Sequence, residues 1–286
     1  MSATSQLSYE SRMRPRYAAL AATAAVLLLA AAVIQQLGPH TKVTELTVEL
    51  LTANKRFSLD LLSAFVNAIG SIALALTLAF LFRMASIRNP RRQPYVKVFV
   101  YAGGALVAVT SIAYAVVIGI KAHQFATTGA QTYVEANRLT TSPILLILQL
   151  IGEVAALLLT AAYALVALNA MRVGLLTRFM GYLGVFAGAL VLLQVTQVPV
   201  VQAYWLIALA VLMAGRWPSG TPKAWESGRA EPWPSNRAIR EQRMRGGGAP
   251  PPRGGRRRAA PAPAPVAAPR PSSTRTSAKR KRKRRK

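Results

Sequence analysis

The chain has 286 residues, of which 52% are hydrophobic and only 16% charged, and its formal net charge is +27. Soluble domains carry about 25% charged residues, so this composition indicates an integral membrane protein. Cysteine is absent, which excludes disulfides, cysteine nucleophiles and thiolate metal sites. His40 and His123 stand alone in polar connections, and the sequence therefore predicts neither a metal site nor a cofactor.

Long apolar runs separated by short polar connections predict an all-α, polytopic bundle of transmembrane helices. A helix rises 1.5 Å per residue, so about 20 apolar residues cross the hydrocarbon core of a bilayer. The first run follows a polar N-terminal tail, residues 1–16, and exceeds the ~7–15 apolar residues of a signal peptide. We read it as a span, with a cleaved signal peptide as the alternative. Six spans are predicted within residues 17–215, at residues 17–37, 59–82, 95–120, 143–169, 179–196 and 199–215.

The last two spans are the least regular. Residues 179–215 form one apolar stretch that is too long for a single span and short for two. Gln194, Thr196, Gln197 and Pro199 interrupt it, and proline disfavours helix at and before its own position. A tight turn there gives two short spans, and a re-entrant hairpin is the alternative.

The basic residues predict the orientation. With six spans, the connections on the side of the termini (1–16, 83–94, 170–178) hold nine Lys and Arg, against five on the other side. Loops rich in Lys and Arg stay in the cytoplasm. We therefore expect a multi-pass protein of the cell (inner or plasma) membrane with both termini in the cytoplasm.

Glu153 is the only acid within any of the apolar runs. It lies about 15 Å from the outer end of its predicted span, since it is ten residues along. Polar residues of the second and third spans reach similar depth, and Gln149 shares the helical face of Glu153. The predicted polar layer comprises Glu153, Asn67, Thr110, Ser111, Gln149 and, one turn nearer the surface, Tyr114.

Two roles for this layer stay open. An ionisable side chain inside a membrane is costly and marks a candidate site for a proton, cation or polar solute. Alternatively, an uncharged Glu153 is hydrogen-bonded to Asn67 or Ser111 and holds helices together.

The C-terminal part carries most of the charge, because 21 of the 36 Lys and Arg lie in residues 216–286. Residues 216–245 form a juxtamembrane segment in which Trp217, Trp225 and Trp233 suit a non-helical peptide along the headgroups. Residues 246–286 combine low hydrophobicity with high charge, which predicts a disordered tail. Anionic lipid, ribosomal RNA or other nucleic acid, or a protein are its candidate partners. The basic residues expected to make these contacts are Arg256, Arg257, Arg258, Lys279, Arg280, Lys281, Arg282, Lys283, Arg284, Arg285 and Lys286.

Small residues predict close helix packing in two places. Gly104, Ala108, Ser111, Ala115 and Gly119 form a stripe along the third span. Gly181, Gly184 and Gly188 have a spacing typical of closely packed helices, with a dimer face as one possible use.

The run NAMRVGLLTRFMGYLGVFAGALVLL and the hairpin after it resemble bacterial families of uncharacterised six-span membrane proteins. The segment GRWPSGTPKAWESGRAEPWPS with its basic tail is similar to actinobacterial members of such groups. This resemblance implies a six-span fold and no particular activity. The basic terminus is also similar to the tails of membrane insertases that dock ribosomes, but the insertases' intramembrane arginine has no counterpart in these spans.

The sequence does not predict an enzyme, because the spans lack paired carboxylates and nucleophile–base sets. The first hypothesis is a structural or interaction module whose basic tail contacts anionic lipid or nucleic acid. The alternative is a small transporter or proton-linked solute-binding protein centred on Glu153. Oligomeric state and substrate cannot be read from the residues.

Overall fold

The described part of the chain, residues 3–39, 45–89, 94–193, 199–218, 220–233 and 240 of a computed structural model, contains eight α-helices and no strands. The predicted all-α class is therefore confirmed. All eight helices lie in one unit, residues 1–234, and residues 235–286 form a separate unit.

Four helices are long and apolar enough to cross a membrane: α1 (Ala3–Gln35), α2 (Leu46–Arg88), α3 (Tyr95–Thr127) and α5 (Pro143–Arg172). The predicted starts of the third and fourth spans, at residues 95 and 143, coincide with those of α3 and α5. The other boundaries differ, because α1 includes most of the supposed N-terminal tail and α2 begins thirteen residues before its predicted span. Helix thus continues into the polar flanks of the apolar runs.

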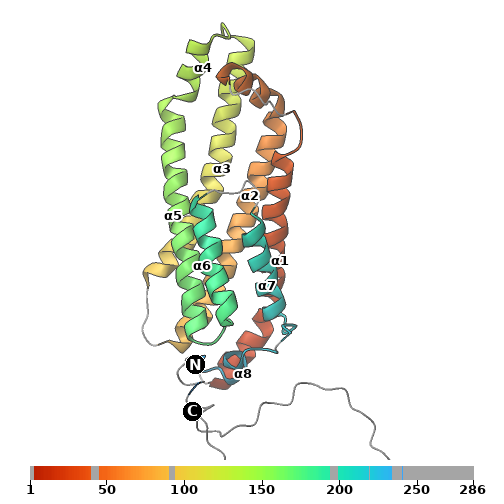
Figure 1. The fold of residues 1–286 in the computed structure, drawn as a ribbon, viewed down its shortest axis with the longest axis vertical. Helices are drawn as coiled ribbons and strands as arrows, with labels where there is room; N and C mark the ends of the chain where they lie inside the picture. Colours follow the sequence, from red (N-terminus) through yellow and green to blue (C-terminus); the bar gives the residue numbers. More distant parts are fainter. Residues whose placement is uncertain are drawn as a thin grey trace, which may run out of the picture. The chain divides into compact units, whose positions relative to one another are not determined.

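The final apolar stretch forms two shorter helices. α6 (Arg178–Leu193) and α7 (Val200–Met213) have 16 and 14 residues, or lengths of about 24 and 21 Å, below the ~30 Å of a hydrocarbon core. In Figure 1 they lie beside only the part of the bundle nearer to α8 (Lys223–Ser227). The remaining helix, α4 (Tyr133–Thr140), lies at the opposite end.

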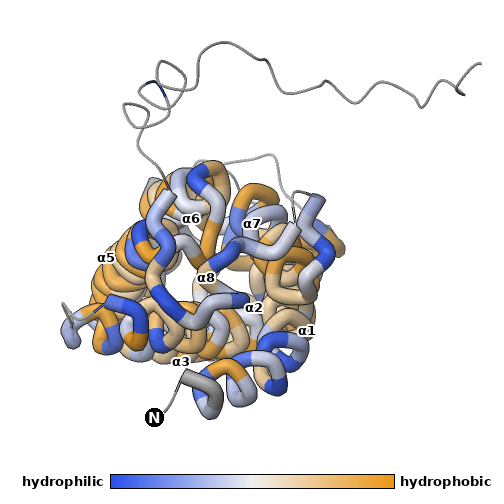
Figure 2. Tube along the Cα trace, turned by 90° about the horizontal axis from the view of Figure 1, so that it is seen from below, coloured by the Kyte–Doolittle hydropathy of each residue, from blue (hydrophilic) through white to orange (hydrophobic). Residues whose placement is uncertain are grey.

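The helices form a closed ring near α8 and an interrupted one near α4. α1 packs on α2, α2 on α3, α3 on α5, α5 on α6, α6 on α7 and α7 back on α1. Figure 2 shows this arrangement from the α8 end, with α8 crossing it. Because α6 and α7 end partway along the bundle, no described helix separates α1 from α5 beyond them.

Glycines allow the close packing of α6 on α5. A Cβ atom at Gly184 would lie 2.7 Å from the Cβ of Ala167 and 2.8 Å from Nε1 of Trp205, and one at Gly188 would lie 2.7 Å from the Cβ of Tyr163. Such distances are too short for any larger residue. Gly181, Gly184 and Gly188, for which a dimer face was one possible use, therefore pack against other helices of the same chain.

The small-residue stripe of the third span has the same kind of role. A Cβ atom at Gly104 would lie 2.5 Å from the Cβ of Ala75 on α2, and one at neighbouring Gly103 would lie 2.9 Å from the backbone nitrogen of Leu159 on α5. α3 is thus wedged between α2 and α5.

The outward faces of the long helices are apolar, which is the reverse of a soluble protein's surface. Large hydrophobic side chains are exposed along each of them, including Val26, Val33, Phe65, Ile69, Val98, Val109, Ile147, Leu150 and Leu157. A bundle with this surface suits hydrocarbon better than water.

Candidate ligand-binding cavity

A cavity of about 720 Å³ lies inside the bundle and is lined by residues of α1, α2, α3, α5, α6 and α7. Its volume falls within the ~300–1,000 Å³ of small-molecule sites. The α5 side of the wall follows the three- and four-residue spacing of one helical face, from Leu148 through Gly152, Ala156 and Leu159 to Tyr163.

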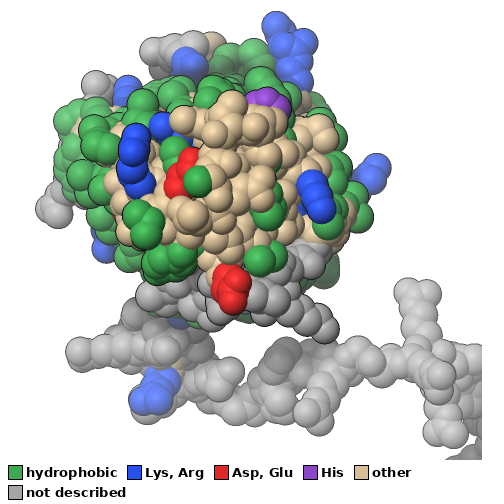
Figure 3. Space-filling view, turned by 90° about the horizontal axis from the view of Figure 1, so that it is seen from above, with side chains coloured by type: hydrophobic (Ala, Val, Ile, Leu, Met, Phe, Trp, Pro, Cys, Tyr) green, Lys and Arg blue, Asp and Glu red, His purple; other side chains and the backbone are tan. Residues whose placement is uncertain are grey.

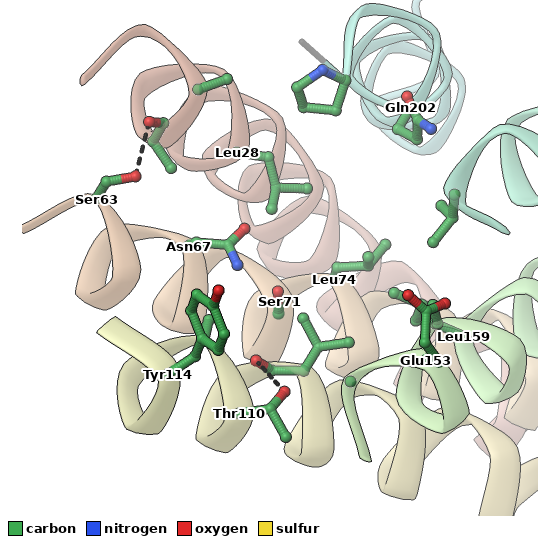
Figure 4. Close-up of a pocket in the computed structure, with 18 of the residues that line it drawn as sticks. Leu28, Ser63, Asn67, Ser71, Leu74, Thr110, Tyr114, Glu153, Leu159 and Gln202 are labelled. Carbon is green, nitrogen blue, oxygen red and sulfur yellow. Dashed lines mark hydrogen bonds between the residues drawn. The ribbon is translucent and has the colours of Figure 1, made fainter. Parts of the chain in front are cut away.

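All six residues of the predicted polar layer lie on the wall of this cavity. α5 contributes Glu153 and Gln149, α2 contributes Asn67, and α3 contributes Thr110, Ser111 and Tyr114. In Figure 4 the Glu153 carboxylate lies across the space from Asn67, Ser71 and Tyr114. The depth of each residue along its predicted span, counted from the sequence, thus grouped residues that are up to 86 positions apart in the chain.

Glu153 is exposed to this space, and within the described residues its carboxylate forms no hydrogen bond or ion pair. The hydroxyls of α3 bond to their own helix, since Thr110 donates to the carbonyl of Leu106 at 2.6 Å and Ser111 to that of Ala108 at 3.1 Å. No bond joins Glu153 to Asn67 or Ser111 in this part of the chain. The arrangement therefore lacks the contacts that an interhelical clamp requires.

Two buried polar atoms on the wall also lack partners among the described residues: the hydroxyl of Tyr163 and Oε1 of Gln202. Tyr163 is completely buried and Gln202 is 6% exposed. The amide nitrogen of Gln202 donates to the carbonyl of Ala187 at 3.3 Å, which fixes the amide and leaves its oxygen unused. Buried polar atoms are normally hydrogen-bonded, so these two are exceptions, and each atom is itself shielded from the cavity.

Sequence reasoning did not assign these two residues to the site, although a signal existed for each. Tyr163 lies on the same face of α5 as Gly152, Ala156 and Leu159. Gln202 is a polar residue in an apolar run, and it lies opposite Glu153 because α7 folds back along α6.

The end of the α6–α7 hairpin closes the cavity on the α8 side. Thr160 of α5 donates to the carbonyl of Gly188 at 3.0 Å, and the next turn of α6 supplies Leu190 and Val191 to the wall. Toward α8, the interior is filled by Trp205, whose Nε1 donates to the carbonyl of Met180 at 2.9 Å. Beyond the hairpin helices, a Cβ at Gly152 would meet no described atom within 4 Å.

A second polar cluster closes the α8 end of the bundle. Arg88 of α2 donates to both oxygens of Glu10 of α1, at 2.8 and 2.6 Å, and to the carbonyl of Ala224 at 3.1 and 2.9 Å. The side chains of Arg88 and Glu10 are 0% and 1% exposed. This pair was not predicted, because 78 residues separate its members and Glu10 stands in a run that reads as a polar tail.

The expectation for the tryptophan segment is wrong for one of its residues. Trp225 is 3% exposed, lies in the short helix α8, and donates from Nε1 to the carbonyl of Leu175 at 3.0 Å. Arg14 lies over its ring, 4.8 Å from the centroid. Trp225 therefore seals the core instead of resting among headgroups.

Other predicted sites lie outside the described residues. These are the tail cations Arg256 to Arg258 and Lys279 to Lys286. Gln194, Thr196 and Gln197, which interrupt the last apolar stretch of the sequence, also lie outside the described residues. Among the described residues, no group of three or more His, Asp or Glu could hold a metal ion.

Comparison with known proteins adds no relative: no protein-family model, no curated protein and no solved structure matches this chain.

Proposed function

We propose that the protein is an integral membrane protein that binds a polar solute in the cavity around Glu153, as a small transporter or proton-linked binding protein. The observation that carries this proposal is the Glu153 carboxylate, which is exposed to about 720 Å³ of space and has no partner among the described residues. Irregular or polar structure at membrane depth is tolerated where it lines a water-filled cavity.

The proposed topology has four full spans, α1, α2, α3 and α5, and a hairpin of α6 and α7 that enters from the α8 side without crossing. The lengths of α6 and α7 support a re-entrant hairpin over two further spans. Ends of such broken segments commonly form the binding sites of transporters near the bilayer midplane. Both topologies put the two termini on one side.

We assign the α8 end to the cytoplasm from the basic residues. That end carries Arg12, Arg14, Arg16, Arg83, Arg88, Arg172 and Arg178, whereas the α4 end carries Lys55, Arg56, Lys121 and Arg138. The α4 end, seen in Figure 3, also bears acidic side chains. Because Lys and Arg are retained in the cytoplasm, the cavity is reached from the external side and closed toward the cytoplasm.

Thiol accessibility tests whether the cavity is wet. The chain has no cysteine, so Ser111→Cys provides a single thiol on the cavity wall. Its matched control is Val109→Cys, two residues along the same helix, where the side chain is 63% exposed on the outward face. A cationic, membrane-impermeant methanethiosulfonate reagent is applied to intact cells, and modification is measured by mass spectrometry.

We expect the reagent to modify Ser111→Cys and to spare Val109→Cys, because a thiol ionises and reacts in water and not in hydrocarbon. If the two thiols are equally unreactive while both variants are inserted and folded, the cavity is occupied by protein or lipid, and the proposal fails.

A second function, contact of the tail with anionic lipid or nucleic acid, is supported by the sequence alone, through the Lys and Arg concentrated in residues 216–286. Deleting residues 246–286 should abolish salt-sensitive binding of the purified protein to single-stranded oligonucleotides or anionic vesicles. If the truncated chain still binds both the oligonucleotides and the vesicles, the tail does not have this function.

A further inference from the structure

The cavity has an excess of acceptors and negative charge. Glu153 is the only ionisable carboxylate among its described lining residues, which include no Lys or Arg. A ligand that satisfies this wall must bring positive charge and N–H donors.

Much of the rest of the wall is apolar. α1 contributes Leu28, and α6 contributes Leu190 and Val191. In Figure 4 Leu28 lies on the α1 side, away from the polar groups of α3. A small inorganic cation would leave this apolar surface unused, whereas an organic ligand can cover it.

The way into the cavity is also amphipathic. Beyond the hairpin helices, the described residues leave an opening between α1 and α5, where Gln149 and Gln35 are exposed. Exposed Leu146, Ile147 and Leu150 flank this opening on α5. A molecule with a charged head and an apolar body can enter there from the outer half of the bilayer.

We propose that the cavity binds an organic monocation, namely a primary ammonium or guanidinium group on an apolar body. This inference rests on the proposed function above. The charged group pairs with Glu153. The apolar body packs against Leu28, Leu190 and Val191. Charge-assisted hydrogen bonds in a partly desolvated site supply the selectivity for the cation.

Four probes of nearly equal shape test the ligand class: phenylbutylammonium, its trimethylammonium analogue, phenylbutanol and phenylbutyrate. Binding is measured by titration calorimetry on the full-length protein in phosphatidylcholine nanodiscs, with empty nanodiscs subtracted for partitioning. We expect the primary ammonium to bind saturably and the alcohol to bind at least about tenfold more weakly than the ammonium. The trimethylammonium analogue, which lacks N–H donors, should fall between them, and the carboxylate should not bind.

Variants locate the binding. Glu153→Gln should weaken phenylbutylammonium binding about tenfold or more, whereas Glu49→Gln, which removes an exposed acid at the α4 end, should not change it. Gly152→Phe keeps the carboxylate but places a ring in the open space beside it, and should also abolish binding. Thermal unfolding of each variant checks that it is folded.

The ligand class is wrong if phenylbutyrate or phenylbutanol binds as tightly as the ammonium, if no saturable ammonium binding occurs, or if Glu153→Gln and Gly152→Phe leave it unchanged. The thiol test at Ser111 then decides the proposed function separately. A wet cavity without cation binding would leave a site for another class of solute.

Discussion

Arg88 and Glu10 illustrate how single residues close the α8 end of this bundle. Their ion pair is shielded from solvent, and the backbone carbonyls of Ala224 and Met84 accept the remaining hydrogen bonds of the guanidinium group. Through these contacts α1, α2 and α8 are held by one side chain. Burying charges is costly, so such a pair stabilises the fold only as long as both partners are present.

Glu10→Gln should therefore lower the free energy of unfolding by about 3–5 kcal/mol, because it leaves the Arg88 charge buried and uncompensated. Unfolding by titration with sodium dodecyl sulfate measures the change. Glu226→Gln, at an exposed acid of the same end, is the control and should change stability by less than about 0.5 kcal/mol. Equal effects of the two variants would show that the pair contributes nothing.

At the residue scale, the sequence predicted the polar layer around Glu153 and missed the ion pair of Arg88 and Glu10. Glu153 was recognisable because an acid in an apolar run has no ordinary explanation, and helical rise then found its neighbours across three helices. Glu10 lies in a polar run where acids are common, and only the folded chain brings it to Arg88. Gln202 and Tyr163 were missed because their unpaired state depends on how the α6–α7 hairpin folds back.

At the scale of elements, the packing of α6 on α5 depends on glycine. The carbonyl of Gly188 accepts from Thr160, and Gly184 lies against both Ala167 and the indole of Trp205. This contact holds the hairpin at the height at which it closes the cavity.

Gly184→Ala should lower the free energy of unfolding by about 1–3 kcal/mol, since the added methyl group cannot be accommodated without moving α5 or Trp205. Gly152→Ala is the matched control, because it is a helical glycine whose Cβ would meet open space. It should be neutral or stabilising by up to about 1 kcal/mol, through helix propensity alone. The same unfolding titration compares them, and a Gly184→Ala variant as stable as Gly152→Ala would contradict the packing.

Hydropathy located the long helices but not their ends. It correctly placed the starts of α3 and α5, where a proline or a polar connection precedes the apolar run. It could not show that α1 and α2 extend as helix beyond the hydrocarbon, because Tyr9 and Met13 pack on the core by tertiary contact. Helix lengths support the proposed re-entrant hairpin between residues 179 and 215, since two helices of 16 and 14 residues are short for spans.

At the scale of the molecule, the proposed orientation makes the two ends chemically distinct. Val134→Cys, at a site 76% exposed on α4, should react in intact cells with a membrane-impermeant maleimide. Arg229→Cys, exposed beyond α8, should react only after permeabilisation. The reverse pattern would invert the orientation and would open the cavity to the cytoplasm.

The central claim is that Glu153 faces water inside the bilayer, and carboxyl modification tests it at the residue itself. The intact protein in nanodiscs is treated with a water-soluble carbodiimide and an amine, and separately with hydrophobic dicyclohexylcarbodiimide, and labelled peptides are identified by mass spectrometry. A wet, open cavity predicts that the water-soluble reagent labels Glu153 at a rate of the same order as exposed Glu49. Labelling of Glu153 by the hydrophobic reagent alone would contradict the account, because the carboxyl would then face lipid.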